Sequence, residues 1–502
     1  MGKRPAQDQA AHAAEGIEKI NVDAVNTAET RKLYKKREKI HPKAARGRFR
    51  KLKWAIMVLT LGIYYLAPWI RWDRGPDAPD QAILLDLPAR KFYFFFIEIW
   101  PQEFYYVTGL LIIAALGLFL ATAIAGRVWC GYTCPQTVWT DLFIWIERKV
   151  EGDRNARIKL DKAPWTASKI IKRVIKHVLW LLVGMLTGGA WVFYFADAPT
   201  LAHELLTFTA PPVAYITIAV LTLTTYLFGG FAREQVCTYM CPWPRIQGSM
   251  FDEQSLLVTY HPKRGEPRGK HKKGESWDNR GHCIDCKQCV AVCPMGIDIR
   301  DGLQLECINC ALCIDACDAV MDKLGLPRGL IGYDTLAGLE AVTHDDPYKK
   351  TKPKFIRGRT IVYALLIALV GGGMLYTLLN RGDLELNVLR DRNPLYITLN
   401  DGSIRDGYTI KVLNKAHKTR KLELSVAGLP DAKLKVIGVK SKTPQSRIPV
   451  TVGPDQVKSL RVFVIVPADA LDSGAEEFDF RVRDVETGEV LRHESVFRGP
   501  GK

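Results

Sequence analysis

The chain has 502 residues, of which 48% are hydrophobic, 12 cysteines and a formal net charge of +17. A charge of this size would suit a nucleic-acid-binding protein, but the basic residues crowd beside apolar segments and form no reading motif, so we expect no nucleic-acid partner. All the cysteines fall into four closely spaced groups, which favours metal ligation by reduced thiols over a secreted disulfide framework.

Residues 1–53 are polar and become strongly basic towards their end, for example at Lys35-Lys36-Arg37. The first apolar stretch begins only at Trp54, so no cleavable signal peptide is visible. We expect a cytoplasmic tail that is disordered in its early part. Its basic end would lie against anionic lipid.

Residues 54–260 and 359–380 contain apolar segments close to the ~20 residues that a transmembrane helix needs. We predict five spans, at roughly 54–70, 104–126, 178–196, 212–232 and 360–379. Loop 127–176 is rich in Lys and Arg, whereas connection 197–211 contains neither. The positive-inside rule therefore places the N-terminus and the cysteine-rich segment in the cytoplasm, and five spans leave the C-terminal domain outside.

An aromatic run at residues 92–96 lies between the first two expected spans. It is too short to cross a membrane, and we interpret it as an interfacial belt on the outer face. Glu98, which follows it, could transfer protons for a quinol or bind a metal ion. A lone carboxylate at a membrane interface costs little free energy, however, so its presence does not require a function.

The second and fourth spans are each followed by the same motif, C-x-Y-x-C-P, with an arginine shortly before it. The cysteines are Cys130 and Cys134 in the first copy and Cys237 and Cys241 in the second. On a helix this spacing puts both thiols on one face with Cβ atoms about 5–6 Å apart. A disulfide needs ~3.8 Å, so shared metal ligation is favoured.

Four thiols from two repeated half-sites can converge on one soft metal, such as Cu(I), zinc or iron–sulfur iron. Met240 could add a thioether ligand. The proline that ends each motif lets the backbone depart from a helix, so a redox-active dithiol remains an alternative to metal ligation. The remaining alternative is that these cysteines are small buried residues at helix ends.

Two successive C-x2-C-x2-C-x3-C runs follow, the spacing of a two-cluster ferredoxin in which the fourth cysteine of each run serves the other cluster. The sequence thus predicts two 4Fe–4S clusters. The ligands of one are Cys283, Cys286, Cys289 and Cys317. Those of the second are Cys307, Cys310, Cys313 and Cys293. Structural zinc is the alternative, but zinc requires only two C-x2-C pairs. Asp318 departs from the pattern, since a proline usually follows the fourth cysteine.

Residues 261–358 are therefore a cytoplasmic α+β ferredoxin-like module with linkers. Its Gly-, Pro- and Lys-rich entry segment could steer an acidic electron donor, which the sequence does not identify, but a solvated loop is the simpler interpretation.

Residues 381–502 change character, with short runs that alternate apolar and polar residues, such as 408–413 and 460–466. Turn signals such as Asn400-Asp-Gly separate the runs. Seven or so short strands predict an all-β immunoglobulin-like sandwich, which lacks the antibody disulfide and any catalytic constellation. We interpret it as a docking module outside the membrane.

The sequence thus describes a multi-domain membrane protein with a five-helix transmembrane bundle, a two-cluster ferredoxin-like module and a C-terminal sandwich. This order of parts resembles the cytochrome oxidase accessory proteins of the CcoG/FixG/RdxA family, membrane polyferredoxins linked to assembly of cbb3-type cytochrome c oxidase. The resemblance rests on the paired C-x3-C-P motifs, the double ferredoxin run, the fifth span and the terminal sandwich, and it covers nearly the whole chain.

The resemblance implies a bacterial inner-membrane protein that reduces Cu(II) to Cu(I) in the cytoplasm for the copper centre of the oxidase. By that analogy a copper ion is the substrate or ligand of Cys130, Cys134, Cys237 and Cys241, and the eight ferredoxin cysteines carry electrons. Oxidase subunits or copper-delivery proteins would be partners, and a homodimer is left open.

Two other functions stay open from the residues. The chain could be an electron conduit from quinol or a cytoplasmic donor to a periplasmic reductase, because C-x3-C-P pairs also resemble those of membrane ferredoxins. It could also be a non-enzymatic scaffold for oxidase assembly. Cu(II) reduction, quinol-driven cluster reduction, and assembly without the four membrane-proximal cysteines would distinguish the three.

Overall fold

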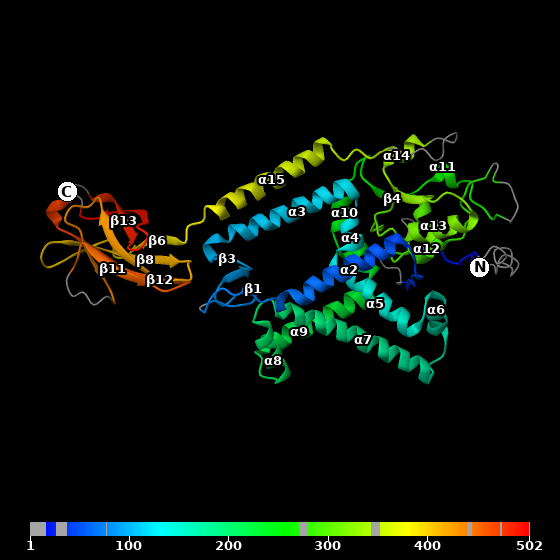
Figure 1. The fold of residues 1–502 in the computed structure, drawn as a ribbon, viewed down its shortest axis with the longest axis horizontal. Coiled ribbons are helices and arrows are strands. Elements are labelled where there is room, and N and C mark those ends of the chain that lie inside the picture. The colour runs from blue at the N-terminus through cyan, green and yellow to red at the C-terminus, as the bar shows by residue number, and fades with distance from the viewer. Residues whose placement is uncertain are drawn as a thin grey trace. The chain divides into compact units, whose positions relative to one another are not determined.

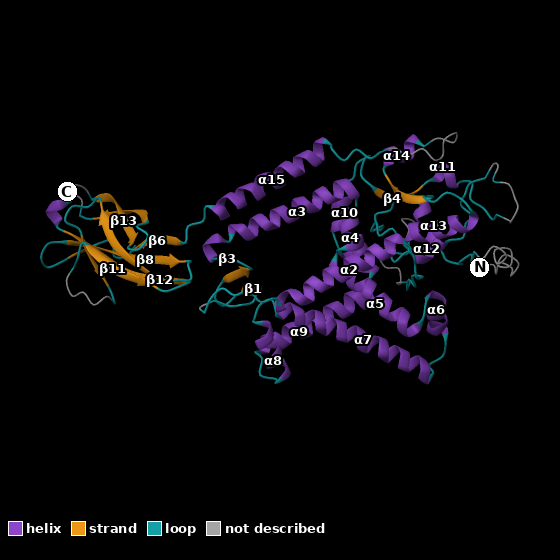
Figure 2. Ribbon diagram, viewed as in Figure 1, coloured by secondary structure: helices purple, strands orange, loops and turns teal. Residues whose placement is uncertain are grey.

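The structure is a computed structural model that describes residues 17–26, 38–76, 78–271, 277, 280–342, 352–438, 444–471 and 474–500. The chain divides into two compact units. One comprises Met1–Ile70 and Gln81–Met374 and is mainly helical, and the other comprises Arg71–Asp80 and Leu375–Lys502 and is mainly strands (Figures 1 and 2). The basic residues expected at 35–37 lie outside the described residues.

The helical unit is built from long helices and short connecting elements. The long helices are α2 (Arg48–Leu66), α3 (Tyr105–Ala125), α5 (Pro135–Glu151), α7 (Ala167–Val192), α9 (Pro212–Thr225) and α15 (Gly358–Leu379). The short helices are α4 (Val128–Tyr132), α6 (Arg154–Lys162), α8 (Ala198–Leu206), α10 (Trp243–Gly248), α11 (Pro262–Gly265), α12 (Gln288–Val292), α13 (Leu312–Leu324) and α14 (Leu336–Ala341). Two π-helical segments are η3 (Tyr226–Ala232) and η4 (Val236–Met240).

In the described part of the chain, four helical segments are long and apolar enough to cross a membrane. They are Arg48–Trp69, Pro101–Ala125, Pro212–Ala232 and Gly358–Leu379. The expected span 178–196 falls in α7, which is not among them, so the count of five is not confirmed. α7 nevertheless packs tightly on α9 through Gly184 and Gly188. A Cβ added to Gly188 would lie 2.8 Å from the carbonyl oxygen of Ile218, the small-residue contact typical of membrane helices.

The aromatic run after the first span forms a small antiparallel sheet, a feature that our interpretation as a belt missed. Its strands are β1 (Ile83–Asp86), β2 (Lys91–Phe94) and β3 (Ile97–Ile99). On β2, Tyr93 is buried between half-buried neighbours, and Phe96 in the following turn is exposed. Glu98 on β3 is buried as well.

The described residues before the first span are hydrogen-bonded to the ferredoxin-like module, whereas residues 1–16, the early part of the expected tail, lie outside the described residues. The backbone N–H of Ile20 donates to the carbonyl of Cys286 at 3.1 Å, and that of Val25 donates to Gly296 at 2.8 Å. Lys19 forms an ion pair with Asp285 at 3.0 Å. The basic residues at the end of the expected tail are partly helical, since α2 begins at Arg48.

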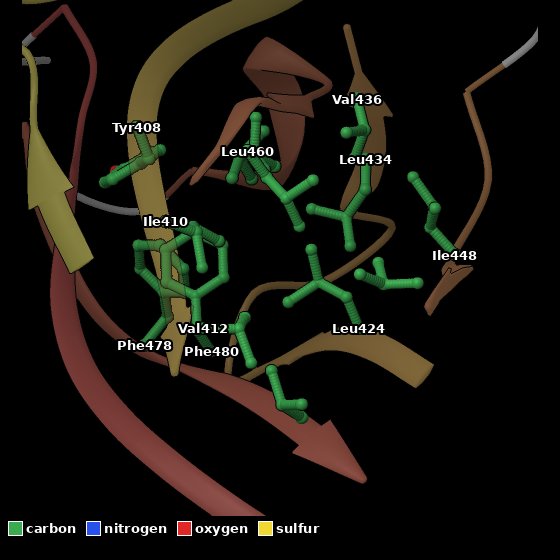
Figure 3. Packing of buried hydrophobic residues seen from close by; sticks show 14 of the residues in the cluster. Tyr408, Ile410, Val412, Leu424, Leu434, Val436, Ile448, Leu460, Phe478 and Phe480 are labelled. Carbon is green, nitrogen blue, oxygen red and sulfur yellow. The ribbon is translucent and has the colours of Figure 1, made fainter. Parts of the chain in front are cut away.

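The second unit is the predicted immunoglobulin-like sandwich. Its described strands are β6 (Leu384–Arg390), β7 (Ile397–Thr398), β8 (Ile404–Asn414), β9 (Arg420–Ala427), β10 (Lys433–Val436), β11 (Arg447–Val452), β12 (Gln456–Val466), β13 (Ala475–Asp484) and β14 (Val490–Arg498). One sheet has the order β10-β12-β8-β6, with β7 beside β8, and the other has the order β11-β9-β13-β14. Apolar side chains from both sheets meet between them, including Ile410, Leu424 and Phe480 (Figure 3).

Candidate functional site

The two cysteine runs surround two small cavities in the described residues of the ferredoxin-like module. Cys283, Cys286, Cys289 and Cys317 line one cavity. Cys293, Cys307, Cys310 and Cys313 line the other, together with Cys289. The fourth cysteine of each run therefore lies with the other run, as the spacing predicts. The remaining walls are mostly apolar, which keeps water away from a bound group.

The backbone repeats the same unusual conformation in both runs. Asp285 and Lys287 have φ of 52° and 56°, and the equivalent Asn309 and Ala311 have φ of 53° and 60°. Non-glycine residues rarely adopt this left-handed region, and such strain collects at functional sites. Where left-handed and right-handed residues alternate, successive backbone N–H groups point into one concave surface. Such a surface can bind an anionic group.

Burial sets the chemistry of these thiols. It raises the pKa of Cys286 to about 11 and that of Cys293 to about 12. Buried thiols of this kind are stable as thiolates only next to a cation, and a bound metal deprotonates them outright. Four thiols in an apolar, anion-accepting cavity fit a 4Fe–4S cluster.

The two cysteines of each C-x3-C-P motif do not lie on one continuous helix, a departure that the prolines had left open. Cys130 lies in α4 and Cys237 in η4, but Cys134 and Cys241 have extended backbones with ψ of 127° and 123°. The cause is the proline after each second cysteine, because a residue before proline is pushed out of the helical region. π-Helical segments such as η4 are frequent at functional sites.

The two motifs nevertheless bring their thiols together. Burial raises the pKa of Cys237 to about 12, and the neighbouring Cys134, Cys130 and Cys241 act in the same direction. Cys130 is buried and Cys241 is exposed, so the group opens on one side. In the described part of the chain, no three His, Cys, Asp or Glu side chains are placed to hold a single metal ion.

The first motif is anchored to the loop of the second cysteine run. The Arg127 guanidinium donates to the backbone carbonyls of Leu305 and Cys307, the latter at 3.0 Å. The Tyr132 hydroxyl donates to the carbonyl of Cys310 at 3.3 Å. Gly131 packs so closely that a Cβ there would lie 2.5 Å from the carbonyl oxygen of Ile308. The C-x3-C-P thiols thus adjoin the second cavity, and Cys130 and Cys237 share an apolar cluster with its cysteines.

A buried carboxylate joins the ferredoxin-like module to the first span. Asp315 on α13 accepts hydrogen bonds from the backbone N–H groups of Phe49 and Arg50, at 3.1 and 2.7 Å. These donors belong to the first turn of α2, where backbone N–H groups have no partner within the helix and a carboxylate is favoured. Arg50 in turn forms a buried ion pair with Asp141 on α5 at 2.8 Å.

Sequence reasoning missed several residues of this site. Gln247 on α10 accepts a hydrogen bond from the Cys130 thiol at 3.2 Å, and no local pattern marks it. Arg127 had a usable signal, because an arginine precedes both motifs. Its counterpart Arg233 has a different role, however, and forms a buried ion pair with Glu147 at 3.0 Å.

The apolar helices, the paired cysteine cavities and the sandwich define a membrane-bound iron–sulfur protein of electron transfer. Comparison with known families agrees with this class. A "4Fe-4S dicluster domain" model matches residues 232–336. A "4Fe-4S binding domain" model matches residues 107–151. The model of the "IG-like fold at C-terminal of FixG" matches residues 374–500.

The chain belongs to the FixG/RdxA family. It is 52% identical over 511 residues to the nitrogen fixation protein FixG of Rhizobium meliloti, with 97% of both chains covered. It is 54% identical over 476 residues to protein RdxB of Cereibacter sphaeroides, covering 94% of this chain and 98% of RdxB. The family resemblance drawn from the motifs is thereby confirmed.

Two more distant matches cover parts of the chain. The ferredoxin-type protein NapH of Escherichia coli is 24% identical over 225 residues, covering 42% of this chain and 64% of NapH. The crystal structure of a FixG-related protein from Vibrio parahaemolyticus is 25% identical, with a TM-score of 0.20, and covers 23% of this chain and 96% of that chain.

Proposed function

We propose that this protein is a membrane iron–sulfur oxidoreductase that reduces Cu(II) to Cu(I) at the four C-x3-C-P thiols. The observation that carries the proposal is the anchoring of the first motif to the second cysteine run. Arg127 and Tyr132 bond directly to the backbone of Cys307 and Cys310. The acceptor thiols are thereby fixed beside four cysteines that would hold a cluster.

The residues of each site have distinct roles. Cys283, Cys286, Cys289 and Cys317 would hold one cluster, and Cys293, Cys307, Cys310 and Cys313 the other. When bound, such clusters supply single electrons. Reduction of Cu²⁺ to Cu⁺ consumes one electron and needs no other reactant.

The C-x3-C-P thiols select the product ion, because thiolates prefer the softer Cu(I). Exposed Cys241 provides the entry side. Burial raises the pKa of Cys130, whereas the charge of Arg127 lowers it. Arg127 therefore favours the thiolate that a metal requires.

The placement in the cell is part of the same proposal. The Lys- and Arg-rich loop 127–176 and the cysteine module would face the cytoplasm of a bacterial inner membrane, and the sandwich would face the periplasm. The sandwich would then dock cbb3-type oxidase subunits or copper-delivery proteins. The reduced copper would serve the oxidase's copper centre.

A second candidate is an electron conduit in which the C-x3-C-P thiols hold iron. It is favoured by the match of a "4Fe-4S binding domain" model to residues 107–151, which include Cys130 and Cys134. The similarity to the ferredoxin-type protein NapH points the same way.

One experiment separates the two candidates. Purified, cluster-loaded full-length protein in detergent is reduced and given Cu(II), and Cu(I) is trapped with a chromogenic chelator. A variant with Cys130, Cys134, Cys237 and Cys241 changed to Ala is compared with Thr133→Ala, which alters an exposed hydroxyl between two of the thiols.

The proposal predicts that the four-alanine variant loses Cu(II) reduction but keeps the iron of wild type, about eight atoms per chain. Thr133→Ala should behave like wild type. Equal Cu(I) yields in wild type and the four-alanine variant would refute the copper site. Loss of about four iron atoms in that variant would favour the conduit.

A further inference from the structure

A polar cavity, far along α5 from the cysteines, has no role in the proposed function. It is open, encloses about 440 Å³, and lies between α5, α6, α7 and η3. Its charged lining residues are Lys39, Glu147, Asp161, Lys169, Arg173, Lys176 and Arg233. Its aromatic wall is formed by Trp165, Trp180, Phe231 and the ring of His177.

The lining carries an excess of positive charge. Five basic residues face two acids, which leaves three positive charges. Arg157 and Glu151 lie behind the wall and pair with lining residues, and their charges cancel. The pKa of His177 is lowered by burial and by Lys176 and Arg173, so its ring adds no charge at pH 7.

Lys169 is the clearest unneutralised charge. It is buried, and its ammonium donates to the backbone carbonyls of Asp161 and Ala163 at 3.2 and 2.6 Å. Among the described residues it forms no ion pair, and it lies 4.9 Å from the ring centroid of Trp165. A buried ammonium that meets only carbonyl groups and a ring can accept an anionic partner, because this would offset its desolvation.

The cavity sits where a membrane surface would meet the protein. Phe231, in its wall, belongs to the candidate span Pro212–Ala232. Trp165 at its edge is 75% exposed, the amphipathic residue typical of membrane interfaces. α7 also presents exposed apolar side chains in the turns that carry the lining cations. They are Ile170, Ile171, Val174, Ile175 and Val178.

We propose that this cavity binds the phosphate headgroup of an anionic phospholipid, with Lys39 and Lys169 as charged contacts. The acyl chains would cover the exposed apolar side chains of α7. This combination favours a lipid over a soluble phosphate compound, which would leave the apolar side chains in water. Basic pockets beside membrane helices on the cytoplasmic side bind lipid headgroups in the same way.

The test uses native mass spectrometry of the full-length, cluster-loaded protein in detergent. Phosphatidylglycerol is the anionic probe, and phosphatidylcholine is the zwitterionic comparison. Lys39→Gln/Lys169→Gln removes two charges from the cavity. Lys159→Gln/Lys172→Gln removes two charges from α6 and α7 at residues that do not line it. Retained iron in each variant shows that the fold is intact.

Wild type and Lys159→Gln/Lys172→Gln should retain phosphatidylglycerol in preference to phosphatidylcholine, and millimolar inorganic phosphate should not displace it. Lys39→Gln/Lys169→Gln should bind it at least about tenfold more weakly, equivalent to about 1.4 kcal/mol. Equal retention by both double variants would overturn the proposal. Displacement by inorganic phosphate would overturn it too, since the site would then serve a soluble anion.

Discussion

Replacing Glu147 with Gln should cost more stability than any surface substitution, because Glu147 is the shared partner of three buried cations. Its carboxylate lies 3.0 Å from Arg157, 3.0 Å from Arg233 and 3.7 Å from Lys176. The side chains of Glu147 and Arg157 are fully buried. The amide of Gln keeps the size of the side chain but leaves these cations without their counter-charge.

The size of the loss follows from the pKa of Glu147. Burial alone would raise this pKa above its ordinary 4.5, but Arg233, Arg157 and Lys176 outweigh burial and hold it at about 2. Each unit corresponds to 1.36 kcal/mol, so the charged form stabilises the fold by about 3 kcal/mol. Breaking a buried ion pair by removing one partner costs about 3–5 kcal/mol, which agrees.

The assay is denaturant unfolding of full-length wild type and Glu147→Gln in detergent at pH 7, followed by tryptophan fluorescence. Asp322→Asn is the control, because it removes an acid from an exposed ion pair with Arg328 and should change stability little. The pKa is depressed in the folded state, so the stabilisation is complete above about pH 4.5 and is lost as pH falls towards 2. The difference between wild type and Glu147→Gln should therefore be equal at pH 7 and pH 5.5. A loss no larger than that of Asp322→Asn would refute the reasoning.

Four further substitutions test other parts of the structure. Cys286→Ala and Cys310→Ala should each lower bound iron by about four atoms per chain, because each removes a ligand of a different cluster; unchanged iron in either would contradict the grouping. Gly131→Ala should slow Cu(II) reduction about tenfold at unchanged iron content, because its Cβ would meet the carbonyl oxygen of Ile308 at 2.5 Å; a wild-type rate would show that this close contact is not needed. Tyr408→Phe should cost about 1 kcal/mol in calorimetric unfolding of the sandwich, because the hydroxyl donates a 2.9 Å bond to the β14 backbone; an unchanged transition would show that water replaces this bond.

The features that sequence predicted well depend on short-range periodicity. Alternation along residues 408–413 and 460–466 gave strands of the sandwich, because one face of each strand is buried. The cysteine spacing gave the two groups of four that line the cavities, because the loops around them are local. The local spacing decides the conformation within each strand and each cysteine run, although the fourth cysteine of each run lies with the other run.

The features that sequence missed depend on contacts between distant segments. Residues 17–26 are ordered by hydrogen bonds to the ferredoxin-like module, more than 250 positions away. Gln247 reaches Cys130 only through the fold. Arg127 lies three residues before Cys130 and Arg233 lies four residues before Cys237, and the fold gives them different partners.

The central claim is that the four C-x3-C-P thiols receive copper and hold it as Cu(I). X-ray absorption at the copper edge tests this most directly, on reduced full-length protein given one equivalent of Cu(II). We predict Cu(I) with sulfur ligands in wild type and in Thr133→Ala, and no sulfur-bound copper when Cys130, Cys134, Cys237 and Cys241 are Ala. Copper that stays Cu(II), or that has only nitrogen and oxygen ligands in wild type, would contradict the account.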